Sequence, residues 1–214
     1  PIDHHHNERL DAPVINFPAV PSFNIPLGSL IPGEIDHFII ADKAISVTNI
    51  VNGSSRLQPV VMQIGQATGI IAGLSIQNNS SPHQISIREV QEYLLQQNGY
   101  LMPYFDVKLN HPHFQSIHRI GATGIPYKWA NQTWFYPATI VLEEEFIAGL
   151  KHFDPSYEST EASNEPLTLQ QTVSFIHQFA THLGIKNNFF QSPNHLQDEI
   201  LKQWKDWGLT GEPT

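Results

Sequence analysis

The chain has 214 residues, of which 40% are hydrophobic and 10% aromatic, and this is enough apolar material for one ordinary domain or two small ones. Eleven basic residues against twenty acidic ones give a formal net charge of −9, which argues against binding to nucleic-acid phosphates or to anionic membranes. The absence of cysteine excludes disulfides, thiolate metal sites and cysteine nucleophiles. No apolar run of about eighteen residues and no signal peptide is present, so we expect no membrane insertion.

The first fifty residues predict extended structure. The chain begins Pro1-Ile2-Asp3 without an initiator methionine, and we expect it to be the C-terminal part of a longer protein. Five prolines in residues 11–34 favour turns and edge strands over helix. The apolar run Phe38 to Ala41 predicts a buried strand, and the β-branched stretch from Ile45 to Val51 predicts its continuation. Asn52-Gly53 predicts a turn.

The stretch SRLQPVVMQIGQATGIIAGLSIQ predicts a buried helix. Pro59 suits the first helical position, and the residues after it are apolar on nearly every face. Gly65, Gly69 and Gly73 recur every four residues, so they form one stripe where another backbone can approach closely. We interpret this stripe as packing against a sheet.

From residue 81 onward the pattern predicts short helices. Ser86 with Glu89, and Thr168 with Gln171, have the spacing of capping boxes. The predicted helices lie at about 86–99, 112–120, 141–152, 168–183 and 193–207. The expected fold class is therefore α+β, with a few strands and a buried helix in a domain of residues 1–80 and an α-helical domain of residues 81–214.

A weak repeat occurs in the second of these domains. The segments HRIGATGI and QFATHLGI, at residues 118–125 and 178–185, both end a predicted helix in Gly-Ile and precede an aromatic loop. The arrangement resembles the helix-loop-helix units of S-layer-homology modules. By this resemblance, residues 81–214 are expected to form an S-layer-homology-like region.

The segment FIIAD and the helix that follows it together predict a ligand site. A strand that ends in Asp42 would place this carboxylate at the carboxyl edge of a sheet, where it can accept hydrogen bonds from ribose-type hydroxyls. The helix beginning at Pro59 would direct the positive end of its dipole at the same region. These features suit a polyol attached to an electron-rich group.

This pattern resembles the C-terminal flavin-binding segment of FAD-dependent oxidoreductases of the glutathione-reductase-like superfamily. The resemblance implies that Asp42 binds the ribityl chain and that the helix start faces the pyrimidine edge of the flavin. The chain departs from the pattern at Ala41, where glycine is usual, and at Gln58, where threonine is usual. The resemblance assigns cofactor binding to Asp42, Leu57, Gln58, Pro59 and Val60. Arg56, just ahead of the helix, has two candidate roles: contact with the flavin or its pyrophosphate, and a salt bridge with a nearby acid.

A closer resemblance, over about residues 1–140, is to a bacterial family of FAD-dependent oxidoreductases sometimes labelled xanthan lyase. It is carried by DHHH, PLGSLIP, ISVTNIVNGSSRLQPVVMQIGQATG, YLMPYFDV, HPHFQSIHRIGATG and WANQTWFYP. The chain contains no Gly-x-Gly-x-x-Gly fingerprint, and GATG at 121–124 lacks its spacing. The implied protein therefore binds FAD together with a missing N-terminal dinucleotide-binding half, and the chain alone is expected to be inactive.

The implied reaction is hydride transfer from a small-molecule or sugar substrate to flavin N5, and a periplasmic or extracellular location is favoured over the cytoplasm.

The run His4 to His6 has four interpretations: an affinity tag, a metal site, structural histidines, or residues beside the flavin or its substrate. Imidazole titrates near neutral pH, so the last interpretation makes His5 and His6 the candidate catalytic residues. His113 and His118 lack the four-residue spacing of zinc pairs, so no metal site is predicted.

Two alternative functions remain open. The aromatic loop with Trp129, Trp134, Phe135 and Tyr136 fits either a sugar-stacking platform or the plug of a small core. A platform would make the C-terminal region a non-catalytic cell-surface or carbohydrate-binding module. A histidine-based metal hydrolase is the third candidate function.

The first turn of the helix predicted from about residue 141 is expected to be solvated, with the acidic residues Glu143, Glu144 and Glu145.

Overall fold

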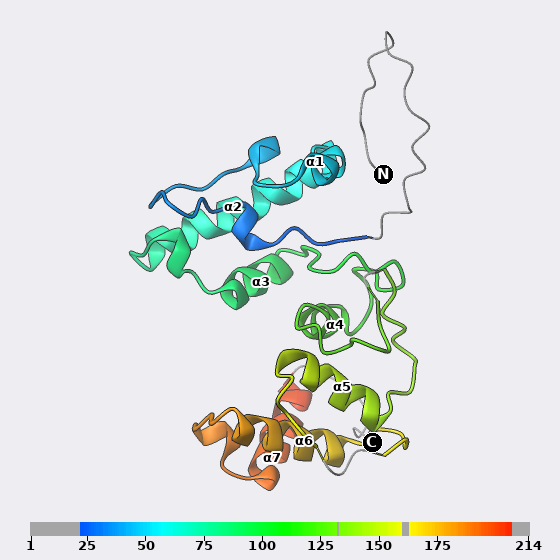
Figure 1. The fold of residues 1–214 in the computed structure, drawn as a ribbon. Coiled ribbons are helices and arrows are strands. Elements are labelled where there is room, and N and C mark those ends of the chain that lie inside the picture. Colours follow the sequence, from blue (N-terminus) through cyan, green and yellow to red (C-terminus); the bar gives the residue numbers. More distant parts are fainter. Residues whose placement is uncertain (1–21, 132, 160–162, 207–214) are drawn as a thin grey trace. The chain divides into compact units, whose positions relative to one another are not determined.

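The computed structural model describes residues 22–131, 133–159 and 163–206, and within these ranges the chain is helical (Figure 1). One isolated antiparallel bridge, between Leu142 and Pro166, is the only β pairing in the described ranges. The predicted α+β fold with strands is therefore wrong. The α-helices are α1 (Asn49–Ser55), α2 (Gln58–Gln77), α3 (Ile87–Gln96), α4 (Phe114–Gly121), α5 (Glu143–Phe153), α6 (Leu169–His182) and α7 (Pro193–Asp206), and the 3-10 helices are η1 (Leu27–Ser29), η2 (Asp42–Ala44), η3 (Pro82–Gln84) and η4 (Asn188–Phe190).

The segment predicted as two strands, 38–51, is irregular at first and then helical. Its described backbone forms two bonds with the region of η1, from the Ile40 N–H to the Leu30 carbonyl (2.8 Å) and from the Ser46 N–H to the Ser29 carbonyl (2.9 Å). A strand needs a continuous ladder with a neighbour, and two separate bonds do not form one. The Thr48 hydroxyl then accepts from the Val51 N–H (3.3 Å) and caps α1, which contains the predicted Asn52-Gly53 turn.

The long apolar helix is confirmed as α2, with Pro59 in its first turn. Its buried side chains are Ile64, Thr68, Ile71 and Leu74, which form one face. Ile64, Ile71 and Leu74 share a core with residues from the preceding loops and from α3, namely Leu30, Ile45, Ile85 and Val90. The opposite face of α2 is exposed, so the expectation of a helix buried on all sides is wrong.

The described chain divides into two compact units, one up to residue 119 and one from residue 120 onward. The sequence had suggested a boundary at residue 80, which lies between α2 and α3. In the structure α3 packs against α2. The Arg119 guanidinium also binds the Glu92 carboxylate of α3 through two bonds of 2.6 and 2.8 Å. Hydrogen bonding to Arg119 lowers the pKa of Glu92.

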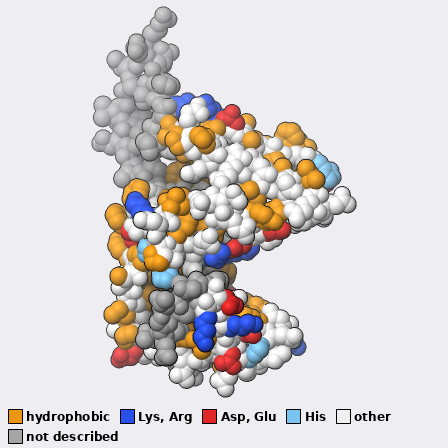
Figure 2. All heavy atoms as spheres, turned by 180° about the vertical axis from the view of Figure 1, so that it is seen from behind, with side chains coloured by type: hydrophobic (Ala, Val, Ile, Leu, Met, Phe, Trp, Pro, Cys, Tyr) orange, Lys and Arg blue, Asp and Glu red, His pale blue; other side chains and the backbone are white. Residues whose placement is uncertain are grey.

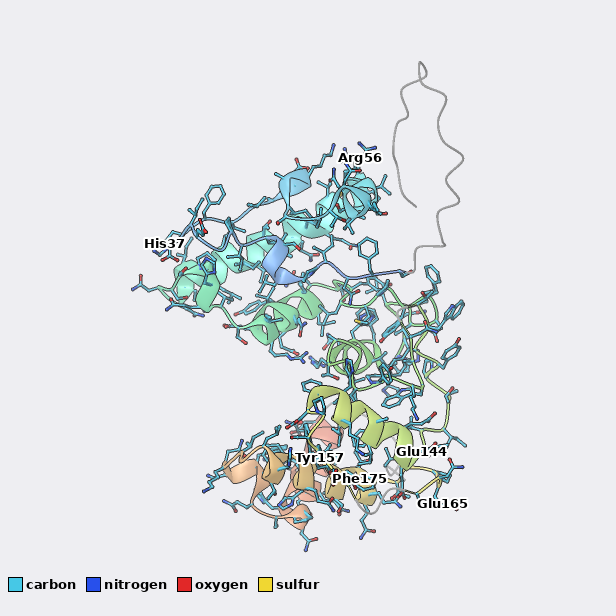
Figure 3. The ribbon with its side chains drawn as sticks, in the orientation of Figure 1. His37, Arg56, Glu144, Tyr157, Glu165 and Phe175 are labelled. Carbon is cyan, nitrogen blue, oxygen red and sulfur yellow. The ribbon has the colours of Figure 1, made fainter. Side chains whose placement is uncertain are left out.

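The second unit has a separate core. Phe146, Ile147 and Leu150 of α5 pack there with Tyr157 and with Phe175 of α6 (Figure 3). The four helices predicted after residue 111 are confirmed within two residues at their starts. The capping box of Thr168 and Gln171 is also confirmed, whereas the Ser86 side chain does not cap α3.

Both Gly-Ile segments of the predicted repeat follow a helix and have a glycine with a positive φ. Gly124 has a φ of 78° and Gly184 a φ of 67°, the left-handed conformation that glycine adopts readily. The Gly184 N–H donates to the Thr181 carbonyl (3.0 Å) and the Ile185 N–H to the Ala180 carbonyl (2.9 Å). The positive φ explains why glycine occurs at both positions. The relation to S-layer-homology modules stays a prediction.

Glu143 departs from the expected solvated turn. Its side chain is buried, with 3% exposed, and accepts from the Ser163 N–H (2.9 Å), the Ser163 hydroxyl (3.0 Å) and the Gln171 amide. A buried carboxylate needs such donors because burial otherwise disfavours its charge. Glu143 therefore ties α5 to the segment before α6 and to α6 itself, while Glu144 is exposed.

Candidate functional site

The candidate site lies where α1 meets α2 in the first unit. Arg56 ends α1 and Leu57 is the N-cap of α2, so the two helices share a connection of two residues. The Arg56 N–H donates to the Asn52 carbonyl (3.2 Å) and the Leu57 N–H to the Ser54 carbonyl (3.3 Å). These bonds fix the direction in which α2 starts (Figure 3, where Arg56 is labelled).

The first turn of α2 presents one backbone donor to its surroundings. The N–H groups of Val60 and Val61 both donate to the Leu57 carbonyl, at 2.9 and 3.0 Å, and Pro59 has no N–H. The Gln58 N–H is left without a hydrogen-bond partner in the described part of the chain. Gln58 and Pro59 are exposed, so the positive end of the dipole of a 20-residue helix is accessible there.

Asp42 does not end a strand, contrary to the prediction. It has a φ of 62°, is exposed and begins η2, which packs against α2. The structure thus brings Arg56, Leu57, Gln58, Pro59 and Val60 together as one continuous turn and places Asp42 on an element that contacts the same helix. His5 and His6 lie outside the described residues.

Two buried polar atoms beside this turn are features that the sequence analysis missed. The Ser55 hydroxyl oxygen and the Asn52 Oδ1 have no hydrogen-bond partner in the described structure, and Ser55 is 1% exposed. Both residues lie on α1, one turn apart. Buried polar atoms normally have partners, and these two have none in the described structure. The sequence alone does not show whether a serine or an asparagine in a helix lacks a hydrogen-bond partner.

The exposed face of α2 carries a stripe of apolar residues along most of its length. Met62 is 75% exposed near one end and Ile76 is 83% exposed near the other. Between them a Cβ added at Gly65, Gly69 or Gly73 would meet no atom within 4 Å. We call these five residues the open stripe of α2. The predicted packing of its glycines against a sheet is not found in the described structure.

The apolar character of α2 has a second implication. It is long enough and apolar enough to cross a membrane by length and composition, and 22% of its most apolar window is buried. Other large hydrophobic side chains also reach the surface of the described chain. Figure 2 shows the side of the molecule that is drawn there, with hydrophobic side chains in orange at several separate places. The open stripe differs from these scattered side chains because it runs the length of one helix.

A cluster of serine, histidine and aspartate occurs in the second unit. The Ser156 hydroxyl donates to Asp154 Oδ1 (2.7 Å), and His182 Nε2 lies 3.0 Å from Asp154 Oδ2 and 3.2 Å from Ser156 Oγ. Hydrogen bonding, first from Ser156, lowers the pKa of Asp154. A catalytic triad places the carboxylate and the hydroxyl on opposite imidazole nitrogens, but here both approach Nε2. The cluster therefore crosslinks the ends of α5 and α6.

His118 of α4 is a buried histidine. Its Nδ1 accepts from the N–H groups of Leu101 (3.2 Å) and Met102 (3.1 Å), and the side chain is 0% exposed. The rings of Phe114, Tyr100 and Tyr104 surround it, with centroids 4.3, 5.4 and 5.8 Å away. Burial lowers the pKa of His118 to about 4 and raises that of Tyr104 to about 12.

No group of three or more histidine, aspartate or glutamate side chains that could hold a metal ion is found among the described residues. Residues 1–94 match the family model described as FAD dependent oxidoreductase. The matched segment includes α1, α2 and most of α3. It supports the family that the resemblance indicated, with FAD-dependent oxidoreduction as its general chemistry. No curated protein and no solved structure matches the chain.

Proposed function

We propose that residues 1–94 form the flavin-facing part of an FAD-dependent oxidoreductase, with the first turn of α2 beside the isoalloxazine ring. The observation that supports this proposal is that the family match covers the α1–α2 junction, where the first turn of α2 is exposed. A helix N-terminus favours an electron-rich group because of its free N–H groups and its dipole. The pyrimidine edge of a flavin is such a group.

The residues around this turn fit parts of FAD. Asp42 can accept hydrogen bonds from ribityl hydroxyls, and the Gln58 N–H can donate to a ring carbonyl. The guanidinium of Arg56 adds positive charge. Leu57 and Val60 are half-buried and supply apolar contact. Pro59 has no N–H, so it adds no second backbone donor to that of Gln58. FAD, when bound, supplies the hydride acceptor for a substrate carbon. Positive charge at this turn would stabilise the electron-rich reduced state.

The rest of the FAD site requires another stretch of polypeptide. The chain carries no Gly-x-Gly-x-x-Gly fingerprint to hold the pyrophosphate. We infer that a dinucleotide-binding segment packs on the open stripe of α2, where the glycines permit close backbone approach. Covering Met62 and Ile76 would stabilise the contact by about 1.5–3 kcal/mol for each side chain.

The substrate side of the site is proposed on chemistry alone. His5 or His6 would act as acid or base toward a small-molecule or sugar substrate, as imidazole does near neutral pH. Replacing each with alanine in the flavin-loaded oxidoreductase should lower the rate of flavin reduction by substrate without lowering the FAD content. Equal loss of FAD in either variant would assign the histidine to cofactor binding instead.

The assignment of Asp42 is tested in a polypeptide that joins this chain to its dinucleotide-binding segment. Asp42→Ala should weaken FAD binding by about tenfold or more, because a charge-assisted hydrogen bond is lost. The measurement is titration of the apoprotein with FAD, followed by flavin fluorescence. Glu34→Ala is the matched control, since Glu34 is an exposed acid of the same unit. Equal affinity of both variants would contradict the role of Asp42.

A further inference from the structure

The chain has two methionines and no cysteine, so its sulfur chemistry is confined to two thioethers. Met62 belongs to the open stripe of α2 and is 75% exposed. Met102 is buried, and its Sδ accepts a hydrogen bond from the Asn24 amide (3.0 Å). The Met102 N–H also donates to Nδ1 of the buried His118 (3.1 Å), which fixes the residue in place. The two sulfur atoms therefore differ in their access to solvent, although both lie in the first unit.

Exposure decides which of the two thioethers reacts with hydrogen peroxide. The sulfur lone pair attacks one peroxide oxygen, the O–O bond breaks, and methionine sulfoxide forms. The sulfur gives up two electrons, and the second oxygen leaves as water with both hydrogens of the peroxide. The reagent must touch the sulfur, so Met62 meets this requirement and the buried Met102 does not. No thiol in the chain competes for the oxidant.

The position of Met62 on α2 links its oxidation to the candidate site. Met62 lies four residues after Gln58, and residues four apart share one face of a helix. Both residues are exposed, so the thioether and the accessible start of α2 lie on the same side of the helix. Oxidation converts a flexible apolar side chain into a polar one, whose oxygen is costly to bury without a donor.

We propose that Met62 is an oxidation site, and that its sulfoxide prevents the dinucleotide-binding segment from packing on the open stripe of α2. This inference rests on the proposed function, because that segment is part of the proposed flavin domain. Packing of the segment would cover Met62 and protect it from peroxide. Oxidation and assembly therefore oppose each other, as thermodynamic linkage requires.

The first experiment uses the present chain and does not depend on the flavin assignment. The chain is treated with hydrogen peroxide, and mass spectrometry of its proteolytic peptides follows the two methionines over time. Met62 should be oxidised about tenfold faster than Met102 or more, because only its sulfur is exposed. Unfolding in urea should remove the difference. Equal rates in the folded chain, or faster oxidation of Met102, would overturn the proposal.

The second experiment uses the polypeptide that joins this chain to its dinucleotide-binding segment. Peroxide treatment of the FAD-free form should raise its Kd for FAD about tenfold or more. Met62→Leu stays apolar and cannot be oxidised, so the Kd of this variant should be the same before and after treatment. Met102→Leu is the matched control and should lose affinity on treatment as the unchanged polypeptide does. Addition of FAD before the peroxide should slow the oxidation of Met62.

The outcomes separate this proposal from the flavin assignment. A treated polypeptide that carries the Met62 sulfoxide and binds FAD as tightly as before would overturn the proposal and leave the flavin assignment intact. Equal loss of affinity in the treated Met62→Leu variant would also overturn it, because the damage would then lie elsewhere. An untreated polypeptide that binds no FAD would contradict the flavin assignment and the assembly step together, whatever the oxidation rates are.

Discussion

His118 shows how one buried side chain makes the first unit sensitive to acid. Its Nδ1 accepts two backbone hydrogen bonds, which a protonated imidazole cannot do. Its pKa in the folded chain is about 4, against 6.5 when exposed. Between these values the unfolded chain binds a proton that the folded chain does not, so acid favours unfolding.

We therefore predict that the free energy of unfolding falls as the pH is lowered from about 6.5 to about 4, by on the order of 3 kcal/mol in total. Urea unfolding followed by circular dichroism at several pH values measures it. His118→Gln, which keeps an acceptor but does not titrate, should flatten this dependence. His83→Gln, a change at an exposed histidine, should leave it unchanged. A slope equally steep in the His118→Gln protein would refute the assignment.

Glu143 gives a second prediction for a single residue. Glu143→Ala should lower the free energy of unfolding of the second unit by about 2–4 kcal/mol, because three donors lose a buried charged acceptor. Glu144→Ala removes an exposed carboxylate from the next position and should change it by less than about 0.5 kcal/mol. Thermal unfolding of the two variants compares them directly. Similar losses of stability in the two variants would mean that Glu143 stabilises the unit through the helix dipole and not through its buried contacts.

At the scale of helices, the open stripe of α2 predicts opposite effects in two settings. Gly69→Ala should stabilise the present chain by about 0.5–1 kcal/mol, since alanine favours helix and the added Cβ meets nothing within 4 Å. In the flavin-loaded oxidoreductase the same change should weaken FAD binding, because the proposed partner segment needs that space. Chemical denaturation and FAD titration measure the two effects.

Gly149→Ala is the matched control for this prediction. A Cβ at Gly149 would collide with the Ile125 carbonyl oxygen, so this variant should lose stability although it also replaces a helical glycine with alanine. Stabilisation of both variants would show that helix propensity alone determines how these substitutions change stability. If Gly69→Ala leaves FAD affinity unchanged, the stripe is not the contact surface.

The helices also show which elements could be predicted from the sequence. α2, α5, α6 and α7 were predicted because each has local signals, such as Pro59 at a start or Thr168 with Gln171 as a cap. The strand at residues 38–41 could not be judged from its apolar run, because a strand exists only with a paired neighbour. The turn predicted at Asn52-Gly53 was wrong because α1, which Thr48 caps at its start, continues through both residues.

At the scale of the whole molecule, the candidate site could be predicted only in part. Arg56 to Val60 are neighbours in sequence, so their proximity required no knowledge of the fold. Their exposure, the unpaired Ser55 hydroxyl and the open stripe depend on what packs against α1 and α2, which no local pattern specifies. The same holds for Asp154 and His182, whose contact joins residues 28 positions apart.

The central claim is that α1 and α2 belong to an FAD-binding domain completed by another stretch of polypeptide. The direct measurement is the visible absorption spectrum of the purified protein that contains both parts, before and after incubation with FAD and removal of free cofactor. The account predicts a flavin spectrum in at least the second sample, with about one FAD per chain. A protein that is folded by circular dichroism yet stays colourless after incubation would contradict it.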